Sequence, residues 1–254
     1  MTKRILLAAC GLIALASCSP KSGPLLADAA PNAPTTEPAP KPAAQPDAAP
    51  PEGLLALPAG AYVLDPAHAS LIFRVNHMGF STYTAHFTKF DAALQLDPKN
   101  PAAATLSATI DPTSLLLSAP PAGFANELQS DKFLDSKKFP KMSFKSTKIE
   151  TIGARNAHVT GDFTLHGVTK PVILDITYNG GWAGIPQDPR ARIGFSAHGK
   201  LNRSDFGIGY GVPAAGSKMG VGDEVEVIIE AEFSGPAQKQ AAAATPAAPT
   251  KSAQ

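Results

Sequence analysis

The stretch Glu224-Val225-Glu226-Val227-Ile228-Ile229-Glu230-Ala231-Glu232-Phe233 alternates apolar and acidic residues over most of its length. Successive side chains of a β-strand point to opposite faces, so this period of two predicts a strand with one buried and one solvated face. The same alternation recurs in residues 71–77, 106–110, 162–165, 172–177 and 192–198. The central part of the chain is therefore expected to form an antiparallel sheet.

Turn-forming residues separate these segments, at Asp97–Pro101, Gly153–Asn156 and His166–Pro171. Short connections favour hairpins, and a meander of hairpins loses its exposed edges when it closes. An eight-stranded closed barrel is wide enough for one small ligand. We therefore predict an all-β fold, an antiparallel β-barrel with one or two short helices. The helical candidates are Gly123–Asp135 and a short helix or irregular lid at Gly207–Gly222.

The first eighteen residues have the layout of a bacterial lipoprotein signal. Lys3 and Arg4 precede an apolar run, Ile5–Ala16, that is too short to span a bilayer as a helix. Leu15-Ala16-Ser17-Cys18 then matches a lipobox. This predicts a signal peptide over residues 1–17 and a lipid anchor on Cys18, where two or more acyl chains would hold the protein stably on a membrane. The alternative is an ordinary secretory peptide in which Cys18 is incidental.

The residue after the cysteine is Ser19 rather than Asp, which resembles an outer-membrane sorting signal. The expected location is the periplasm, as a lipoprotein anchored in the outer membrane. Of the two cysteines, Cys10 lies in the signal peptide and Cys18 is the anchor. The mature domain is then left without a disulfide, a cysteine nucleophile or a cysteine-ligated metal.

Composition divides the rest of the chain. Ten prolines lie between residues 20 and 51, and proline removes amide donors and fixes φ. Residues 18–57 are therefore predicted to be an extended Pro/Ala-rich tether. Residues 58–235 have ordinary globular composition and are expected to form one domain, and the Ala- and Pro-containing residues 236–254 a disordered tail.

Charge and motif content exclude several classes of function. Lys plus Arg number 22 against 21 Asp plus Glu, without a basic stripe, which argues against a nucleic-acid partner. The six histidines are scattered without the spacing of metal ligands. No hydrolase elbow, zinc-peptidase motif or phosphate loop occurs. We therefore expect a protein that is not an enzyme and that has no metal and no cofactor.

Several motifs, in order, resemble the YceI-like family of lipid- and polyisoprenoid-binding periplasmic proteins. They are residues 62–70, 73–81, 127–135, 138–140, 143–146, 161–171, 203–207 and 221–225. The resemblance covers residues 62–233 and implies an extended, lipocalin-like antiparallel barrel with an elongated apolar cavity for an isoprenoid chain. This chain departs from the family at Glu127, where many relatives carry His.

The apolar strand faces are the candidate ligand lining. The residues are Phe73, Val75, Phe87, Leu106, Ile110, Phe163, Leu165, Phe195 and Phe233. The alternative is that they only pack against one another. Small residues on the same faces, Ala108, Ala197, Gly199 and Ala231, are expected to leave space for a guest.

Three polar residues match motif positions of the family: His77, Arg203 and Asp205. They are candidates for a polar mouth that contacts a ligand head group beside the apolar surface. The alternative is structural: Arg203 and Asp205 pair to close a barrel end, and His77 is half-buried with its hydrogen bonds satisfied.

These observations predict non-enzymatic sequestration or transport of an amphiphilic isoprenoid lipid of quinone or polyprenyl type in the cell envelope. The expected partners are that lipid and the membrane that holds the anchor, and the oligomeric state is left open. One alternative is an enzyme acting on the same lipid, with His77 or Asp205 as acid–base. Another is a structural or stress-response envelope protein whose barrel is filled.

Overall fold

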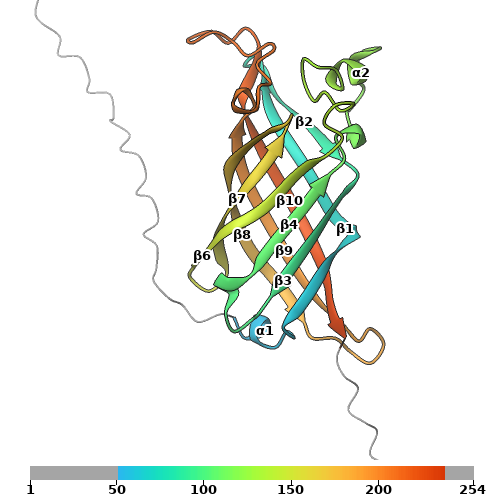
Figure 1. Ribbon diagram of the computed structural model, residues 1–254, viewed down its shortest axis with the longest axis vertical. Coiled ribbons are helices and arrows are strands. Elements are labelled where there is room, and N and C mark those ends of the chain that lie inside the picture. The colour runs from blue at the N-terminus through green and yellow to red at the C-terminus, as the bar shows by residue number, and fades with distance from the viewer. Residues whose placement is uncertain (1–50, 238–254) are drawn as a thin grey trace, which may run out of the picture. The chain divides into compact units, whose positions relative to one another are not determined.

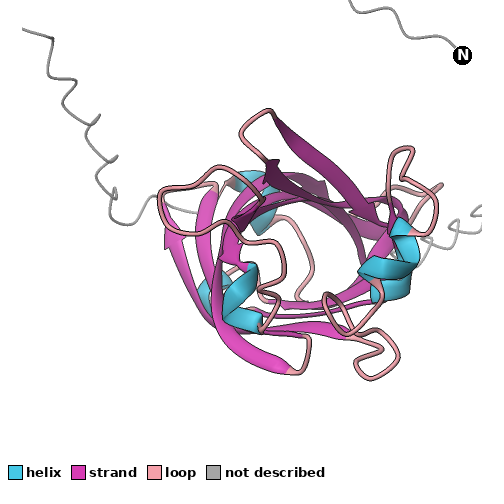
Figure 2. Ribbon diagram, turned by 90° about the horizontal axis from the view of Figure 1, so that it is seen from above, coloured by secondary structure: helices cyan, strands magenta, loops and turns pink. Residues whose placement is uncertain are grey.

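The computed structural model describes residues 51–237, which form a closed antiparallel β-barrel (Figures 1 and 2). Closure comes from β10 (Val221–Ala237), the last strand, which pairs with β9 on one side and with β1 (Gly60–His77) on the other. The remaining strands are β2 (Ser81–Phe87), β3 (Phe90–Leu96), β4 (Thr105–Ile110), β5 (Leu115–Leu116), β6 (Met142–Ile152), β7 (Asn156–Leu165), β8 (Val168–Trp182) and β9 (Arg190–Asn202).

The ten strands occupy eight positions around the barrel, because β2 and β3 share one position and β5 and β4 share the next. Strands β2 and β3 pair with successive parts of β1, while β5 pairs with β2 and β4 with β3. The predicted all-β class is therefore confirmed. The helices are short: α1 (Glu52–Leu55), α2 (Phe124–Leu128), η1 (Pro101–Ala103), η2 (Pro112–Ser114) and η3 (Arg203–Phe206). None of the helices between residues 51 and 237 is long and apolar enough to cross a membrane.

The predicted turns lie between strands in part: Asn156 already belongs to β7, and Val168–Pro171 of the third predicted turn belong to β8. His166 and Gly167 connect β7 to β8 and both have positive φ, 52° and 76°, the combination of a type I′ hairpin turn. Gly153, at φ 63°, lies in the β6–β7 turn. Gly167 has a second reason to be glycine, because a Cβ at this position would overlap the ring of Phe139.

The barrel end that carries α1, which we name the α1 end, is closed by residues expected in the tether (Figure 1). Leu54 and Leu57 are buried in the core there. The Tyr62 hydroxyl donates to the Pro58 carbonyl at 2.7 Å, and burial, with a smaller contribution from Tyr178, raises the pKa of Tyr62 to about 12. The tether boundary predicted at residue 57 is therefore wrong for residues 52–57, because their leucines have the open end of a barrel to pack against.

The opposite end, which we name the α2 end, carries the β1–β2 turn, α2 and the β9–β10 loop (Figure 1). Helix α2 is shorter than the predicted Gly123–Asp135 and gives way to turns, in which Asp135 has a φ of 41°. The turns bring Phe133 and Leu134 onto the core cluster that includes Phe206 and Ile208. Residues 207–220 are irregular, as the lid prediction allowed.

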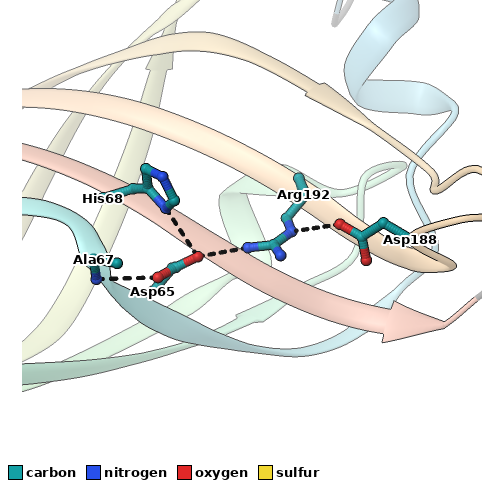
Figure 3. Close-up of polar contacts among 5 residues, drawn as sticks. All are labelled: Asp65, Ala67, His68, Asp188 and Arg192. Carbon is teal, nitrogen blue, oxygen red and sulfur yellow. Dashed lines mark hydrogen bonds and ion pairs between the residues drawn. The ribbon is translucent and has the colours of Figure 1, made fainter.

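An ion-pair cluster fastens the outer wall near the α1 end (Figure 3). Arg192 on β9 donates to Asp65 Oδ2 at 2.6 Å and to Asp188 Oδ2 at 3.3 Å. His68 Nδ1 lies 3.1 Å from the same Asp65 oxygen, and the Ala67 amide donates to the other. Hydrogen bonds from His68 and Arg192 hold the pKa of Asp65 below its ordinary value. The cluster joins β1 to β9 across β10, where β1 has a register shift between Leu64 and Ala69.

Arg203 fastens the β9–β10 loop at the α2 end. Its guanidinium is buried and donates to four backbone carbonyls at 2.8 to 3.0 Å, those of Ile208, Tyr210, Val221 and Gly222. Burial lowers the pKa of Arg203 from its ordinary value, and Asp223 opposes the shift. Two of these carbonyls, of Ile208 and Tyr210, lie in the loop and two, of Val221 and Gly222, begin β10, so this one side chain ties the start of the loop to the strand that follows it.

We expect Arg203→Met to lower the free energy of unfolding by about 3 kcal/mol or more, because it leaves several carbonyls without donors. Arg203→Lys should recover only part of this loss, since an ammonium cannot reach four carbonyls with the planar geometry of a guanidinium. Urea denaturation measures both variants. The control is Arg190→Met, an exposed position that should change stability by less than about 0.5 kcal/mol. An Arg203→Met protein of unchanged stability that binds ligand poorly would instead assign Arg203 to the ligand.

Candidate ligand cavity

The barrel encloses an apolar cavity of about 260 Å³. Its lining runs from Leu54 and Leu96 near the α1 end to Phe87 and Leu201 towards the α2 end, so it extends along the barrel axis. Every residue of the lining is apolar. The cavity therefore presents neither a hydrogen-bonding side chain nor a charge to its contents.

The predicted lining residues lie on the inner face of the barrel. Seven of the nine line the cavity: Phe73, Phe87, Leu106, Ile110, Phe163, Phe195 and Phe233. Val75 and Leu165 are buried, at 9% and 8% exposure, but lie outside the lining because they are close to the strand ends at the β1–β2 and β7–β8 turns. Contact of these residues with a ligand stays a prediction.

The small residues act in two ways. Ala108, Ala197 and Ala231 line the cavity and leave room in it. Gly199 does not leave room, because a Cβ there would lie 2.7 Å from Leu174 Cδ2 and 3.0 Å from the Ile173 carbonyl oxygen. Leu174 therefore fills the space that a side chain at position 199 would take, and Leu174 itself lines the cavity.

Sequence reasoning missed several lining residues near the α1 end. Leu54 comes from α1, while Pro101 and Ala104 come from η1 and the residue after it. None of these residues lies in an alternating strand pattern. The available signal was the spacing of Leu54 and Leu57, two apolar residues three apart after a proline-rich stretch.

None of the predicted polar mouth residues belongs to the cavity lining. His77 is exposed at the end of β1, and the Arg203 guanidinium bonds to the loop carbonyls. Asp205 is exposed and borders a separate, more polar hollow of about 250 Å³ together with Lys200 and Glu224. A head-group role for these three residues stays a prediction.

The structural alternative for the same residues needs two corrections. Between the two described residues Arg203 and Asp205 there is no ion pair, and the carboxylate that supports η3 is Asp223, which accepts from the Ser204 amide at 2.8 Å and from its hydroxyl at 2.6 Å. His77 is exposed rather than half-buried. Within residues 51–237, no group of three or more His, Cys, Asp or Glu side chains is placed to hold a metal ion.

Cys18 and the predicted signal peptide lie outside the described residues, as does the tail from residue 238. Residues 236–237, also predicted as tail, instead form the end of β10. The lipid anchor on Cys18 stays a prediction.

Comparison with solved structures shows the same architecture. BcnA of Burkholderia cenocepacia aligns with a TM-score of 0.57 at 22% identity, over 66% of this chain and 98% of that chain. A YceI protein of Campylobacter jejuni aligns with a TM-score of 0.52 at 29% identity, over 63% and 90%. A polyisoprenoid-binding domain of Saccharophagus degradans aligns with a TM-score of 0.51 at 11% identity, over 70% and 100%.

The sequence relatives come from bacteria. A UPF0312 protein of Vibrio parahaemolyticus is 36% identical over 181 residues, 68% of this chain and 90% of the relative. A UPF0312 protein of Vibrio cholerae is 38% identical over 154 residues, 59% of this chain and 78% of the relative. The sequence profile of the YceI-like domain matches residues 62–233, the span of the barrel from β1 to β10. The chain therefore belongs to the YceI-like domain family.

Proposed function

We propose that this protein sequesters or carries an isoprenoid lipid of quinone or polyprenyl type in its barrel. The observation that carries the proposal is the cavity of about 260 Å³ with a wholly apolar lining. Cavities lined only by apolar groups stay dry or accept an apolar guest, because water inside would lose its hydrogen bonds.

The energetic cost of an empty cavity supports a guest. Cavity volume costs about 24 cal/mol per Å³, so about 260 Å³ corresponds to about 6 kcal/mol. Whole domains are stable by only about 5–15 kcal/mol. A fold that maintains such a volume forgoes much of its attainable stability, and an apolar ligand restores the missing contacts.

The shape of the cavity and one structural relative support an isoprenoid tail. The lining follows the barrel axis, which suits a chain better than a compact ring system. The Saccharophagus degradans domain with the same fold is described as polyisoprenoid-binding. An amphiphile with such a tail would leave its polar head at a barrel end, because the wall offers no partner for it.

The same wall favours a carrier over an enzyme. Neither His77 nor Asp205, the acid–base candidates of the enzymatic alternative, lies on the lining. A bound tail would then contact hydrocarbon alone, without a group that moves a proton. The filled-barrel alternative predicts a core without a connected void, and the cavity counts against it.

The amino-terminal sequence supports a cellular location for this activity. The lipobox at Leu15–Cys18 favours a periplasmic lipoprotein on the outer membrane. The membrane is the only phase in which such a cargo is soluble, and a carrier anchored there stays close to it.

Lipid extraction tests the proposal. Organic solvent applied to the purified protein should release an isoprenoid lipid in near-stoichiometric amount, identified by mass spectrometry. Added prenyl alcohols should bind with an affinity that falls at least about tenfold for each five-carbon unit removed, since each buried methylene contributes about 0.8 kcal/mol. Exchange of the alcohol for another head group should matter less. Protein that yields no lipid and takes up no prenyl probe would contradict the proposal.

Filling the cavity should separate binding from folding. We expect Ala108→Leu combined with Ala231→Leu to weaken binding of a prenyl probe at least about tenfold. The same change should leave the free energy of unfolding equal or higher, because the new methyl groups occupy empty space. The matched control is Thr109→Leu with Glu232→Leu, exposed neighbours on the same two strands, which should retain affinity. Equal affinities in the two double variants would show that the ligand does not occupy the cavity.

A further inference from the structure

At the α2 end, several apolar side chains that the fold does not need for its packing are exposed to solvent. Phe80 is 81% exposed and Met219 is 71% exposed, the highest values for large apolar side chains within residues 51–237. Tyr210, at 53%, lies in the same loop as Met219. We name the two segments that carry them, residues 77–80 and 207–220, the tip. Such residues usually mark a contact surface when they gather in one place.

The two segments of the tip are in direct contact. The Met78 amide donates to the Gly220 carbonyl at 2.9 Å. A Cβ placed at Gly79 would lie 3.3 Å from the Cδ of Lys218, so the turn packs on the stem of this lysine. Phe80 and Met219 each adjoin one of these contact points in sequence, so the two segments that carry them are neighbours.

The tip is also rigidly supported. Met78 and Gly79 both have positive φ, 55° and 73°, the Phe80 amide bonds to the His77 carbonyl, and Asn76 Oδ1 accepts from the Gly79 amide at 2.9 Å. On the other side, the Arg203 guanidinium donates to the carbonyls of Ile208 and Tyr210 in the tip. The apolar side chains are therefore displayed from a fixed base and do not reflect a frayed loop.

The charges of the tip fit a lipid surface. Its residues include His77 and Lys218 and not one Asp or Glu. Lys132 adds a second cation, 5.0 Å from the centre of the Tyr210 ring. Apolar side chains that enter the acyl boundary, with lysines that stay at the head groups, are the composition of interfacial membrane-binding sites.

The α1 end is the competing surface. Leu55, Trp182 and Ile185 are exposed there, but only between 41% and 46%. The acidic group beside them, Asp188, is paired with Arg192, and the exposed Arg190 adjoins it, so this end is not the more acidic one. The tip contains no Asp or Glu, although exposed Glu127, Asp131 and Asp205 lie in the segments around it. The tip is distinguished by the greater exposure of its apolar side chains.

We infer that the tip is a membrane-docking surface, through which the barrel sits on an anionic lipid bilayer to exchange its cargo. This inference rests on the proposed function, because a water-insoluble cargo has to be taken from and returned to a lipid phase. Two large apolar side chains and a few cations give a reversible association, which suits a protein that must leave the membrane again.

The test uses the chain from residue 19 onward, which contains the whole barrel and lacks the predicted acyl anchor. Vesicles of equal parts phosphatidylethanolamine and phosphatidylglycerol are sedimented with the protein, and transfer of a fluorescent prenyl probe from these vesicles is timed. Phe80→Ser with Met219→Ser should reduce both the bound fraction and the transfer rate at least about fivefold. Equilibrium binding of the same probe delivered from detergent should not change, because neither residue lines the cavity.

The matched control is Trp182→Ser with Ile185→Ser, which removes two exposed apolar side chains from the α1 end. It should retain vesicle binding and transfer. Wild-type protein that does not sediment with the vesicles would overturn the inference, as would a control variant that loses as much as the tip variant. Failure of the detergent-delivered probe to bind wild-type protein would refute the proposed function instead, while sedimentation still decides the docking surface.

Discussion

Closure of the sheet is the constraint on which the rest of the structure depends. Once β10 pairs with β1, the number of strands sets the width of the interior, and the inward side chains must either fill that width or leave it open. At Ala92, Ala108, Ala197 and Ala231 they leave it open. The hydrogen bonds between the strands keep the barrel at this diameter, although the core side chains do not fill it.

The two ends are closed by different means. At the α1 end, leucines from a short helix and two buried tyrosines pack as an ordinary core. At the α2 end, one buried guanidinium holds an irregular loop while α2 and its turns cover the strands. Gln129 Oε1 and Ser130 Oγ lie buried in that cover without partners. The Tyr178 hydroxyl is likewise buried without a partner at the α1 end, so each closure leaves a polar group unsatisfied.

Much of the wall could be predicted because strand alternation is a local property. Phe73, Leu106 and Phe233 were assigned to the inner face from the period of two alone, which does not depend on distant partners. Position along the axis is not encoded in that period, so Val75 and Leu165 were assigned with the rest although they lie beyond the cavity. The barrel width and the small inward residues predict space for a guest, and the family resemblance adds the elongated shape of the cavity.

The remaining features depend on partners that leave no pattern in sequence. Arg203 bonds to carbonyl oxygens, which every residue possesses, so its sequence neighbour Asp205 was the natural but incorrect partner. Leu54 followed a proline-rich stretch and had no visible partner until the barrel end was in place. The sequence predicts spare volume at Gly199, because the approach of Leu174 from the neighbouring strand leaves no local pattern.

The position of Gly60 beside Pro236 has an architectural consequence. The backbone enters the barrel and leaves it at the same pole, the one capped by α1 (Figure 1). Both flanks of residues 51–237 are therefore attached at that pole. The far pole carries no chain attachment, so the fold is a module with one fixed attachment side and one side formed only by its own loops.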